Sequence, residues 1–302
     1  MAQNNKRVGV IGLGSMGIGI AQSLLREGFD VAGADVVEAQ RERFRQAGGR
    51  AVAQPREAAE GASAVFSVVV NAAQNDAVLF GEGGSAEAMA PGTVFVSCCT
   101  VDPAYPPKTA ARLAERGVLY LDAPISGGAV KAAAGRLTVM GAGAPEAFAA
   151  AEPALAAVAE KVFRIADRPG PGSAVKLINQ LLAGVHIAAA SEAMALAAKL
   201  GLDLPTVYEV ITASAGNSWM FENRVPHILE GDYQPRSAVN IFTKDLGIVV
   251  DSARANQFPV PIAGAAMQMF LMAAAAGMGR DDDASVVRVY QKLAGIELPT
   301  QD

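Results

Sequence analysis

The chain has 302 residues, of which 51% are hydrophobic and 18% charged, and its formal net charge at pH 7 is -5. This length is about twice the ~150-residue prior for one domain, so it predicts two domains with a sizeable core. Lys and Arg number 25 against 30 Asp and Glu. The chain therefore has no excess of basic residues, and nucleic acid is not expected as its main partner.

The few cysteines and histidines exclude several kinds of site. Cys98 and Cys99 are adjacent, which makes an unstrained disulfide between them geometrically difficult, so we expect free thiols in a reducing cytoplasm. His186 and His227 are the only histidines, and no metal site is predicted from them. The catalytic proton carrier is expected to be another residue type.

Two uncharged apolar stretches have the length of an export or membrane segment. Val8–Leu25 contains five glycines, which weaken a continuous helix and argue against a secretion leader. Ile262–Gly279 reaches the lower limit for spanning a bilayer, but its small side chains favour a buried helix of a soluble protein. The predicted location is the cytoplasm.

Short β-rich runs alternate with helical stretches through the first half of the chain. Such alternation predicts a parallel sheet with helices on both faces. The predicted strands are Arg7–Ile11, Asp30–Ala34, Ala64–Val70, Thr93–Ser97, Val118–Leu121, Leu137–Met140 and Lys161–Ile165.

The alternation of β-rich and helical stretches ends after Ile165, at a loop rich in Pro and Gly that spans Asp167–Gly172. We place the domain boundary there, with an α/β domain over 1–166 and an all-α domain over 167–302. A long helix, Ser173–Leu200, is expected to join them. Further helices are predicted at Leu204–Ala213, Ser237–Asn256, Pro261–Met278 and Asp283–Leu293.

A glycine pattern follows the first predicted strand. Gly12, Gly14 and Gly17 form G-x-G-x-x-G between a strand and a helix, which is typical of a Rossmann-type dinucleotide-binding domain. Gly12 would permit the tight turn, Gly14 the approach of a pyrophosphate, and Gly17 close packing of helix and strand. The predicted cofactor-binding segment is Gly12, Leu13, Gly14, Ser15, Met16 and Gly17.

Asp35 ends the second predicted strand. Its carboxylate could accept hydrogen bonds from both adenosine ribose hydroxyls and would repel the 2′-phosphate of NADP, and the two valines that follow supply no cation. The predicted cofactor is therefore NAD, although Asp35 could instead only cap the next helix. Loops after later strands should flank the rest of the dinucleotide through Val70, Asn71 and Thr100.

A second glycine turn, Asp122–Gly128, follows the fifth predicted strand. Ser126 together with the backbone amides of Gly127 and Gly128 could bind a carboxylate or a phosphate. Taken alone, the segment could equally be an ordinary loop.

Lys176 and Asn179 lie early in the long helix and share one face. A lysine there is poorly placed for solubility, and desolvation would lower its pKa toward neutrality, which suits a general acid/base. The alternative is an exposed lysine paired with a carboxylate. Lys244–Asp245 places a second lysine in an apolar helix, where spacing alone favours an ordinary surface pair.

In order and spacing these motifs resemble the β-hydroxyacid dehydrogenase family over essentially the whole chain. The resemblance implies a Rossmann domain joined through a long helix to an all-α domain, NAD-dependent oxidation of a small hydroxy acid, and a homodimer or homotetramer. It also implies a role for each matched residue. Lys176 would be the acid/base, Asn179 would orient the substrate, Ser126, Gly127 and Gly128 would hold its carboxylate, and Lys244 with Asp245 would line nicotinamide and substrate.

Two positions depart from the family pattern. Gln180 stands where the family often has Asn, and Cys99 precedes Thr100 where a Ser-Thr pair is usual. The run Lys176–His186 looks most like the L-threonate dehydrogenase branch. In that branch His186, with Gln180, could contact a polyol substrate, or His186 could be a hydrogen-bonded core histidine.

Other functions stay open at this point. Within the family the substrate could be 3-hydroxyisobutyrate or tartronate semialdehyde. Imine reductases share the architecture but lack the catalytic lysine, so Lys176 argues against them. A catalytically silent NAD-binding module would bind cofactor without turning over any hydroxy acid.

Overall fold

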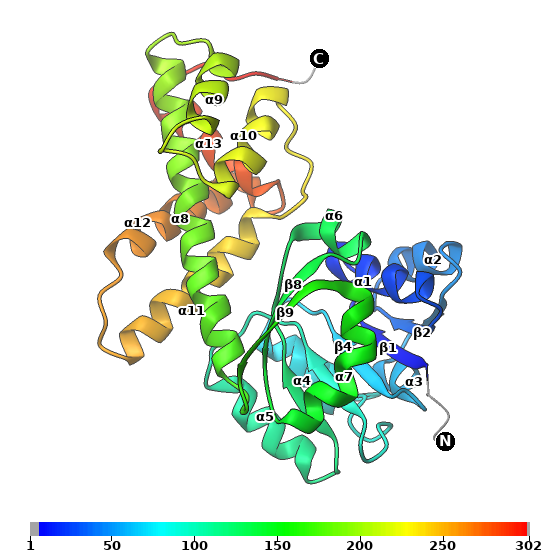
Figure 1. The fold of residues 1–302 in the computed structure, drawn as a ribbon. Helices are drawn as coiled ribbons and strands as arrows, with labels where there is room; N and C mark the ends of the chain where they lie inside the picture. The colour runs from blue at the N-terminus through cyan, green and yellow to red at the C-terminus, as the bar shows by residue number, and fades with distance from the viewer. Residues whose placement is uncertain (1–5, 301–302) are drawn as a thin grey trace. The chain divides into compact units, whose positions relative to one another are not determined.

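The computed structural model describes residues 6–300 (Figure 1). The chain forms two compact units, Met1–Lys176 and Leu177–Asp302. The division falls inside one helix, α8 (Pro171–Lys199), which begins in the first unit and continues into the second. The domain boundary that we place at residue 166 lies just before this helix and stays a prediction.

The first unit is built on one mixed sheet. Within the described residues it has nine strands in the order β3-β2-β1-β4-β5-β6-β8-β7, and β9 pairs with β8. The pairs from β3 to β6 are parallel, as predicted, whereas β8 runs antiparallel to β6 and β7. The strands are β1 (Arg7–Ile11), β2 (Asp30–Ala34), β3 (Arg50–Val52), β4 (Ala64–Ser67), β5 (Val94–Ser97), β6 (Leu119–Asp122), β7 (Ile125–Ser126), β8 (Leu137–Ala142) and β9 (Ala159–Ala166).

Helices cover both faces of this sheet because successive side chains of a strand point to opposite faces. In β5, Val94 and Val96 belong to one apolar cluster, while Phe95 between them belongs to the other. All three are fully buried, so the central strands have no solvent-facing side. The helices are α1 (Ser15–Arg26), α2 (Glu38–Gln46), α3 (Pro55–Ala59), α4 (Ala72–Phe80), α5 (Tyr105–Ala114), α6 (Gly128–Ala133) and α7 (Pro145–Val158).

The second unit is helical, as the sequence predicts. Its elements after α8 are α9 (Leu204–Thr212), α10 (Trp219–Glu230), α11 (Val239–Ala255), α12 (Pro261–Ala273), the turns η1 (Ala274–Met278) and η2 (Asp283–Val286), and α13 (Val287–Ala294). Helix α10 is absent from the sequence prediction because Pro226 and several polar residues interrupt its apolar pattern. Its start is nevertheless capped, since the Ser218 side chain accepts a hydrogen bond from the Phe221 N–H.

Two helices among the described residues are long and apolar enough to cross a membrane by length and composition, Pro171–Lys199 and Pro261–Met278. Half of the most apolar window of the first is buried, and 28% of that of the second. The prediction that the second stretch is a buried helix is therefore wrong, and Ile262 at its start is 68% exposed. Only a minority of the residues in this Ala- and Met-rich stretch are buried in the interior of the unit.

Candidate active site

The glycine loop after β1 has the backbone that its sequence predicts. Gly12 has φ +92°, and a Cβ on it would lie 2.5 Å from the Val68 carbonyl oxygen, so no other residue fits. A Cβ on Gly17 would lie 1.8 Å from the Gly12 oxygen, which requires glycine where α1 crosses the loop. Gly14, by contrast, has open space around the same position.

That open space suits the pyrophosphate of a dinucleotide. Gly14 precedes the first residue of α1, and the first turn of this helix contains no acidic residue. The N-terminus of a helix presents unpaired N–H groups and a partial positive charge to an anion. The loop from Gly12 to Gly17 therefore fits the phosphates of NAD.

Asp35 lies beside the same loop. One carboxylate oxygen accepts a hydrogen bond from the Leu13 N–H at 2.7 Å, and the other accepts from the Val37 N–H at 2.8 Å. The carboxylate thus holds the glycine loop and also the turn before α2, so the ribose and capping interpretations of Asp35 are compatible. Each oxygen keeps a further lone pair for a ribose hydroxyl.

Arg41 is a cation near this site that the sequence analysis missed. Its guanidinium donates to the backbone oxygen of Asp35 at 2.5 Å and also pairs with Glu38. Hydrogen bonds from Arg45 and Arg41 lower the pKa of Glu38. The Glu38–Arg41 pair could have been predicted from the sequence, because a spacing of three residues in a helix places Arg41 one turn after Glu38.

The other predicted cofactor residues lie after later strands of the same sheet. The Asn71 side chain accepts a hydrogen bond from the Gln74 N–H and caps α4. The Val70 N–H donates to the Gln74 side chain, and Val70 is 44% exposed. Thr100 is half-buried and follows buried Cys99. All three stand at the carboxyl edge of the parallel strands, where dinucleotides bind in this class of fold.

The turn at Ser126–Gly128 joins strand β7 to the short helix α6. Gly127 has φ +139° and Gly128 has φ +72°, conformations that a side chain would strain. A Cβ on Gly128 would meet no atom within 4 Å. The backbone at Gly128 is therefore accessible to a small anion.

Lys176 and this turn belong to the same compact unit. The lysine lies on the second turn of α8 and is only 8% exposed. The start of α8 is hydrogen-bonded to Asp122, the last residue of β6, through Gly170 and Ser173. Asp122 is the first residue of the predicted turn Asp122–Gly128, but the sequence pattern predicts no role for it.

In the second unit, Gln180 and the Lys244–Asp245 pair form one polar group. Gln180 donates to an Asp245 oxygen at 2.5 Å and accepts from Asn179 at 2.9 Å. The Lys244 ammonium lies 2.6 Å from the other Asp245 oxygen. Asp245 is 1% exposed, so the pair is not the ordinary surface pair that spacing alone favours. It couples α8 to α11.

Close packing of these two helices makes that group possible. A Cβ on Gly184 would lie 2.9 Å from the Leu246 side chain, so a larger residue on α8 would displace that side chain of α11. His186, two residues after Gly184 on α8, is half-buried.

The other histidine belongs to a buried hydrogen-bond network. His227 Nδ1 lies 2.9 Å from an Asp282 oxygen, and Arg236 contacts its Nε2. Burial raises the pKa of Asp282, but hydrogen bonds from His227, Arg236 and Ala284 outweigh it and hold the pKa below its ordinary value. We expect this network to have a structural role, connecting α10 with η2, and no catalytic role.

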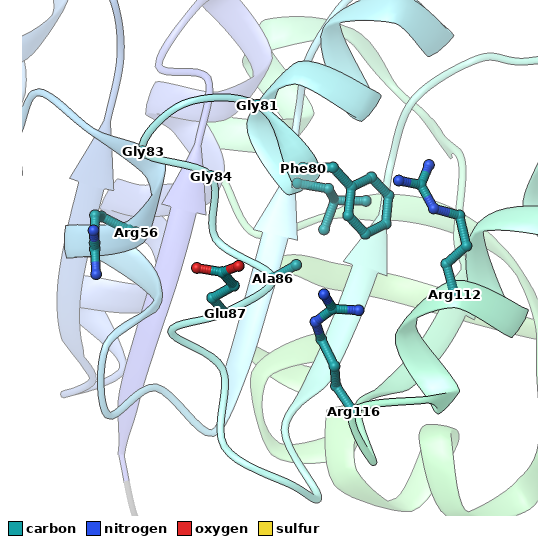
Figure 2. Close-up of a pocket in the computed structure, with 10 residues that line it drawn as sticks. Arg56, Phe80, Gly81, Gly83, Gly84, Ala86, Glu87, Arg112 and Arg116 are labelled. Atoms are coloured by element: carbon teal, nitrogen blue, oxygen red, sulfur yellow. The ribbon is translucent and has the colours of Figure 1, made fainter.

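A surface hollow of about 230 Å³ in the first unit contains none of the predicted site residues. Figure 2 shows Glu87 among Arg56, Arg112 and Arg116 in this hollow. Arg112 lies at the end of α5 and Arg116 in the turn that follows it, before β6 begins. The hollow thus adjoins the amino edge of the strands, opposite the glycine loop.

Both halves of the chain match family models. Residues 7–166 match the NAD binding domain of 6-phosphogluconate dehydrogenase. Residues 170–290 match the model described as NAD-binding of NADP-dependent 3-hydroxyisobutyrate dehydrogenase.

Curated relatives cover almost the whole chain. It is 55% identical over 295 residues to L-threonate dehydrogenase of Cupriavidus necator, with 98% of each chain covered. It is 50% identical over 293 residues to L-threonate dehydrogenase of Escherichia coli K12, covering 97% of this chain and 96% of the relative.

A solved structure agrees with these matches. The crystal structure of 3-hydroxyisobutyrate dehydrogenase from Salmonella typhimurium superposes with a TM-score of 0.89 at 51% identity, covering 93% of this chain and 99% of that one. Taken with the glycine loop and the two family models, these similarities show that the chain belongs to the β-hydroxyacid dehydrogenases, oxidoreductases that act on a hydroxyl group with a nicotinamide dinucleotide.

Proposed function

We propose that this protein oxidises a small hydroxy acid with NAD, and that L-threonate, converted to 2-oxo-tetronate, is its substrate. The supporting relatives carry that name at 55% and 50% identity. One observation carries the chemical part of the proposal. Buried Lys176 lies on a helix whose first turn is bonded to the strand that leads into the Ser126–Gly128 turn.

Lys176 is the acid/base of the proposed reaction. In its neutral form the amine accepts the proton of the substrate hydroxyl, and in the reverse direction the ammonium returns that proton to the alkoxide. NAD, when bound, would accept the hydride that leaves the carbon bearing this hydroxyl. One side chain therefore serves both directions.

The Ser126–Gly128 turn holds the substrate carboxylate. The Ser126 hydroxyl and the amides of Gly127 and Gly128 are donors of the kind that bind an anion, and the positive φ angles of both glycines aim the backbone for it. Fixing the carboxylate orients the carbinol carbon, and such positioning supplies much of the catalysis.

Asn179 and Gln180 follow Lys176 by one helical turn and supply amide groups to substrate hydroxyls. Gln180 is oriented by its bond to Asp245, and Asp245 in turn holds Lys244. We assign Lys244 and Asp245 to nicotinamide and substrate, and half-buried His186 to a distal hydroxyl.

The cofactor is NAD rather than NADP. Asp35 presents a carboxylate where a 2′-phosphate would have to lie, and Arg41, which donates to the Asp35 backbone oxygen, is paired with Glu38. Bringing a second anion beside the Asp35 carboxylate would cost coulombic energy. The name of the second family model contains NADP, so this choice rests on Asp35 alone.

The active protein is a homodimer or homotetramer in the cytoplasm. Exposed apolar side chains along α8 and α12, including Ile178, Leu196 and Ile262, support an association between copies. Burial raises the pKa of Cys98, which disfavours its reactive thiolate form.

A substrate panel tests the proposal. NADH formation is measured with L-threonate, D-threonate, D-glycerate and 3-hydroxyisobutyrate, with NADP in parallel. We expect one strong NAD-dependent signal, from L-threonate. Preference for 3-hydroxyisobutyrate, the substrate named for the solved relative, would overturn the substrate, and a higher rate with NADP would overturn the role of Asp35.

A further inference from the structure

Asp122 is a buried carboxylate that holds the beginning of a distant helix. It ends β6 and is 1% exposed. One of its oxygens accepts the N–H of Gly170 and the N–H of Ser173, both at 2.9 Å. The other oxygen accepts the Ser173 hydroxyl at 2.7 Å. All three donors lie at the start of α8.

Helix α8 has no side chain directly before it that could cap its N-terminus. Its first residue, Pro171, follows Gly170, which has φ +113° and no side chain. The first N–H groups of a helix lack partners within the helix, and a carboxylate at this end is favourable. Asp122 supplies the missing cap from a strand. Burial raises the pKa of Asp122, and the donors from Ser173 and Gly170 oppose that rise.

The contact between helix and strands is also tight. A Cβ on Gly172 would lie 2.5 Å from the Met140 carbonyl oxygen and 3.0 Å from the Asp122 carboxylate. The helix therefore begins with its backbone against β6 and β8. Its position along these strands has little freedom.

Both ends of this connection lead to residues of the proposed site. Ser126 follows Asp122 by four residues, and Lys176 follows Ser173 by three, or about 4.5 Å along the helix axis. We propose that Asp122 is a positioning residue, which sets the distance between the acid/base Lys176 and the turn that holds the substrate carboxylate. This inference rests on the proposed function for the identity of the reaction.

Two substitutions separate position from charge. Asp122→Asn keeps an oxygen for the two N–H donors and turns its amide toward the Ser173 hydroxyl, which can accept. Asp122→Ala removes all three acceptor contacts. A misplacement of about 1 Å costs on the order of 100-fold in rate. We therefore expect Asp122→Ala to lower kcat by ~10- to 100-fold with a severalfold higher KM for the acid.

The conservative variant should rescue the reaction. We expect Asp122→Asn to keep kcat within about threefold of the unmodified enzyme, with the same pH profile, because its hydrogen bonds survive. NAD affinity should be unchanged in both variants, since the glycine loop is untouched. Asp122→Asn as impaired as Asp122→Ala, or with a displaced pH profile, would overturn positioning in favour of an effect of the charge.

Hydrogen exchange tests the connection without using activity. In Asp122→Ala we expect faster exchange at residues 170–176 and unchanged exchange in the central strands. Asp203→Ala, which removes the side-chain cap of α9, is the control and should alter neither α8 nor kcat. Unchanged exchange at 170–176 in Asp122→Ala would overturn the proposal. If the unmodified enzyme oxidises no hydroxy acid, the proposed function fails, while the exchange comparison still decides the connection.

Discussion

At the proposed site, Lys176 and Asp122 have different roles: Lys176 is the acid/base, and Asp122 positions it. In the proposed reaction the lysine transfers the proton, and the Asp122 carboxylate holds the start of the helix that carries it. Sequence spacing indicated the first role, because a cation early in an apolar helix is unusual. It could not indicate the second, because residues 122 and 173 are brought together only by folding.

Replacing Lys176 by Ala should reduce kcat by ~10²- to 10⁴-fold, the contribution of a positioned general acid/base. Affinity for NAD should stay within about twofold, since no cofactor contact of the glycine loop is lost. Steady-state rates and NADH titration measure the two quantities. Lys176→Arg should be nearly as inactive, because a guanidinium cannot give up its proton.

The control for this variant is Lys199→Ala, at the other end of α8, where the exposed ammonium donates a hydrogen bond to the Ala294 carbonyl oxygen. It should leave kcat unchanged. Near-full activity of Lys176→Ala would remove this residue from the reaction.

At the scale of elements, a strand or helix could be predicted from the sequence only where its apolar pattern extends over enough residues. Strands β1 and β2 have the predicted bounds, because in each a charged residue is followed by four consecutive buried residues, all small or apolar. Strands β3 and β7 have three and two residues, too few for any periodicity. They exist because neighbouring strands offer them hydrogen-bonding partners.

The buried network of α10 and η2 predicts a pH-dependent stability. Asp282 is fully buried and accepts hydrogen bonds from His227, Arg236 and Ala284. A hydrogen bond to a charged group contributes about 2 kcal/mol, so Asp282→Asn should lower the free energy of unfolding by about that amount at pH 7. Urea unfolding followed by circular dichroism measures it.

The sign of the pH dependence follows from the lowered pKa of Asp282. The ionised carboxylate stabilises the fold above its unfolded pKa, and this contribution is lost as the pH falls through the lower folded pKa. The difference between Asp282→Asn and the unmodified protein should therefore shrink below pH 4. Asp281→Asn, in a more exposed pair with Arg288, should cost under about 1 kcal/mol. Equal effects of the two substitutions would contradict the network.

At the scale of the whole molecule, the second unit leaves apolar side chains in contact with water. On α12, Ile262 is 68% and Leu271 41% exposed. Large apolar side chains left exposed in this way favour contact with another protein surface. Light scattering should therefore give the mass of a dimer or tetramer, and Ile262→Asp with Leu271→Asp should shift it toward the monomer.

Phe163→Asp is the control for this prediction, because it places the same charge at an exposed aromatic residue of β9 in the first unit. It should leave the mass unchanged. A monomer in the unmodified protein would contradict the proposed assembly.

The alternation of strands and helices in the first half, the glycine loop and the helical second half were determined by the sequence alone. Each depends on local physics: alternation of apolar side chains, the conformational freedom of glycine and helical periodicity. The antiparallel strand β8, the Gln180–Asp245 bond and the anchoring of α8 by Asp122 were decided only by the tertiary structure. They join residues far apart in the chain, and such partners are selected by packing, which no local pattern records.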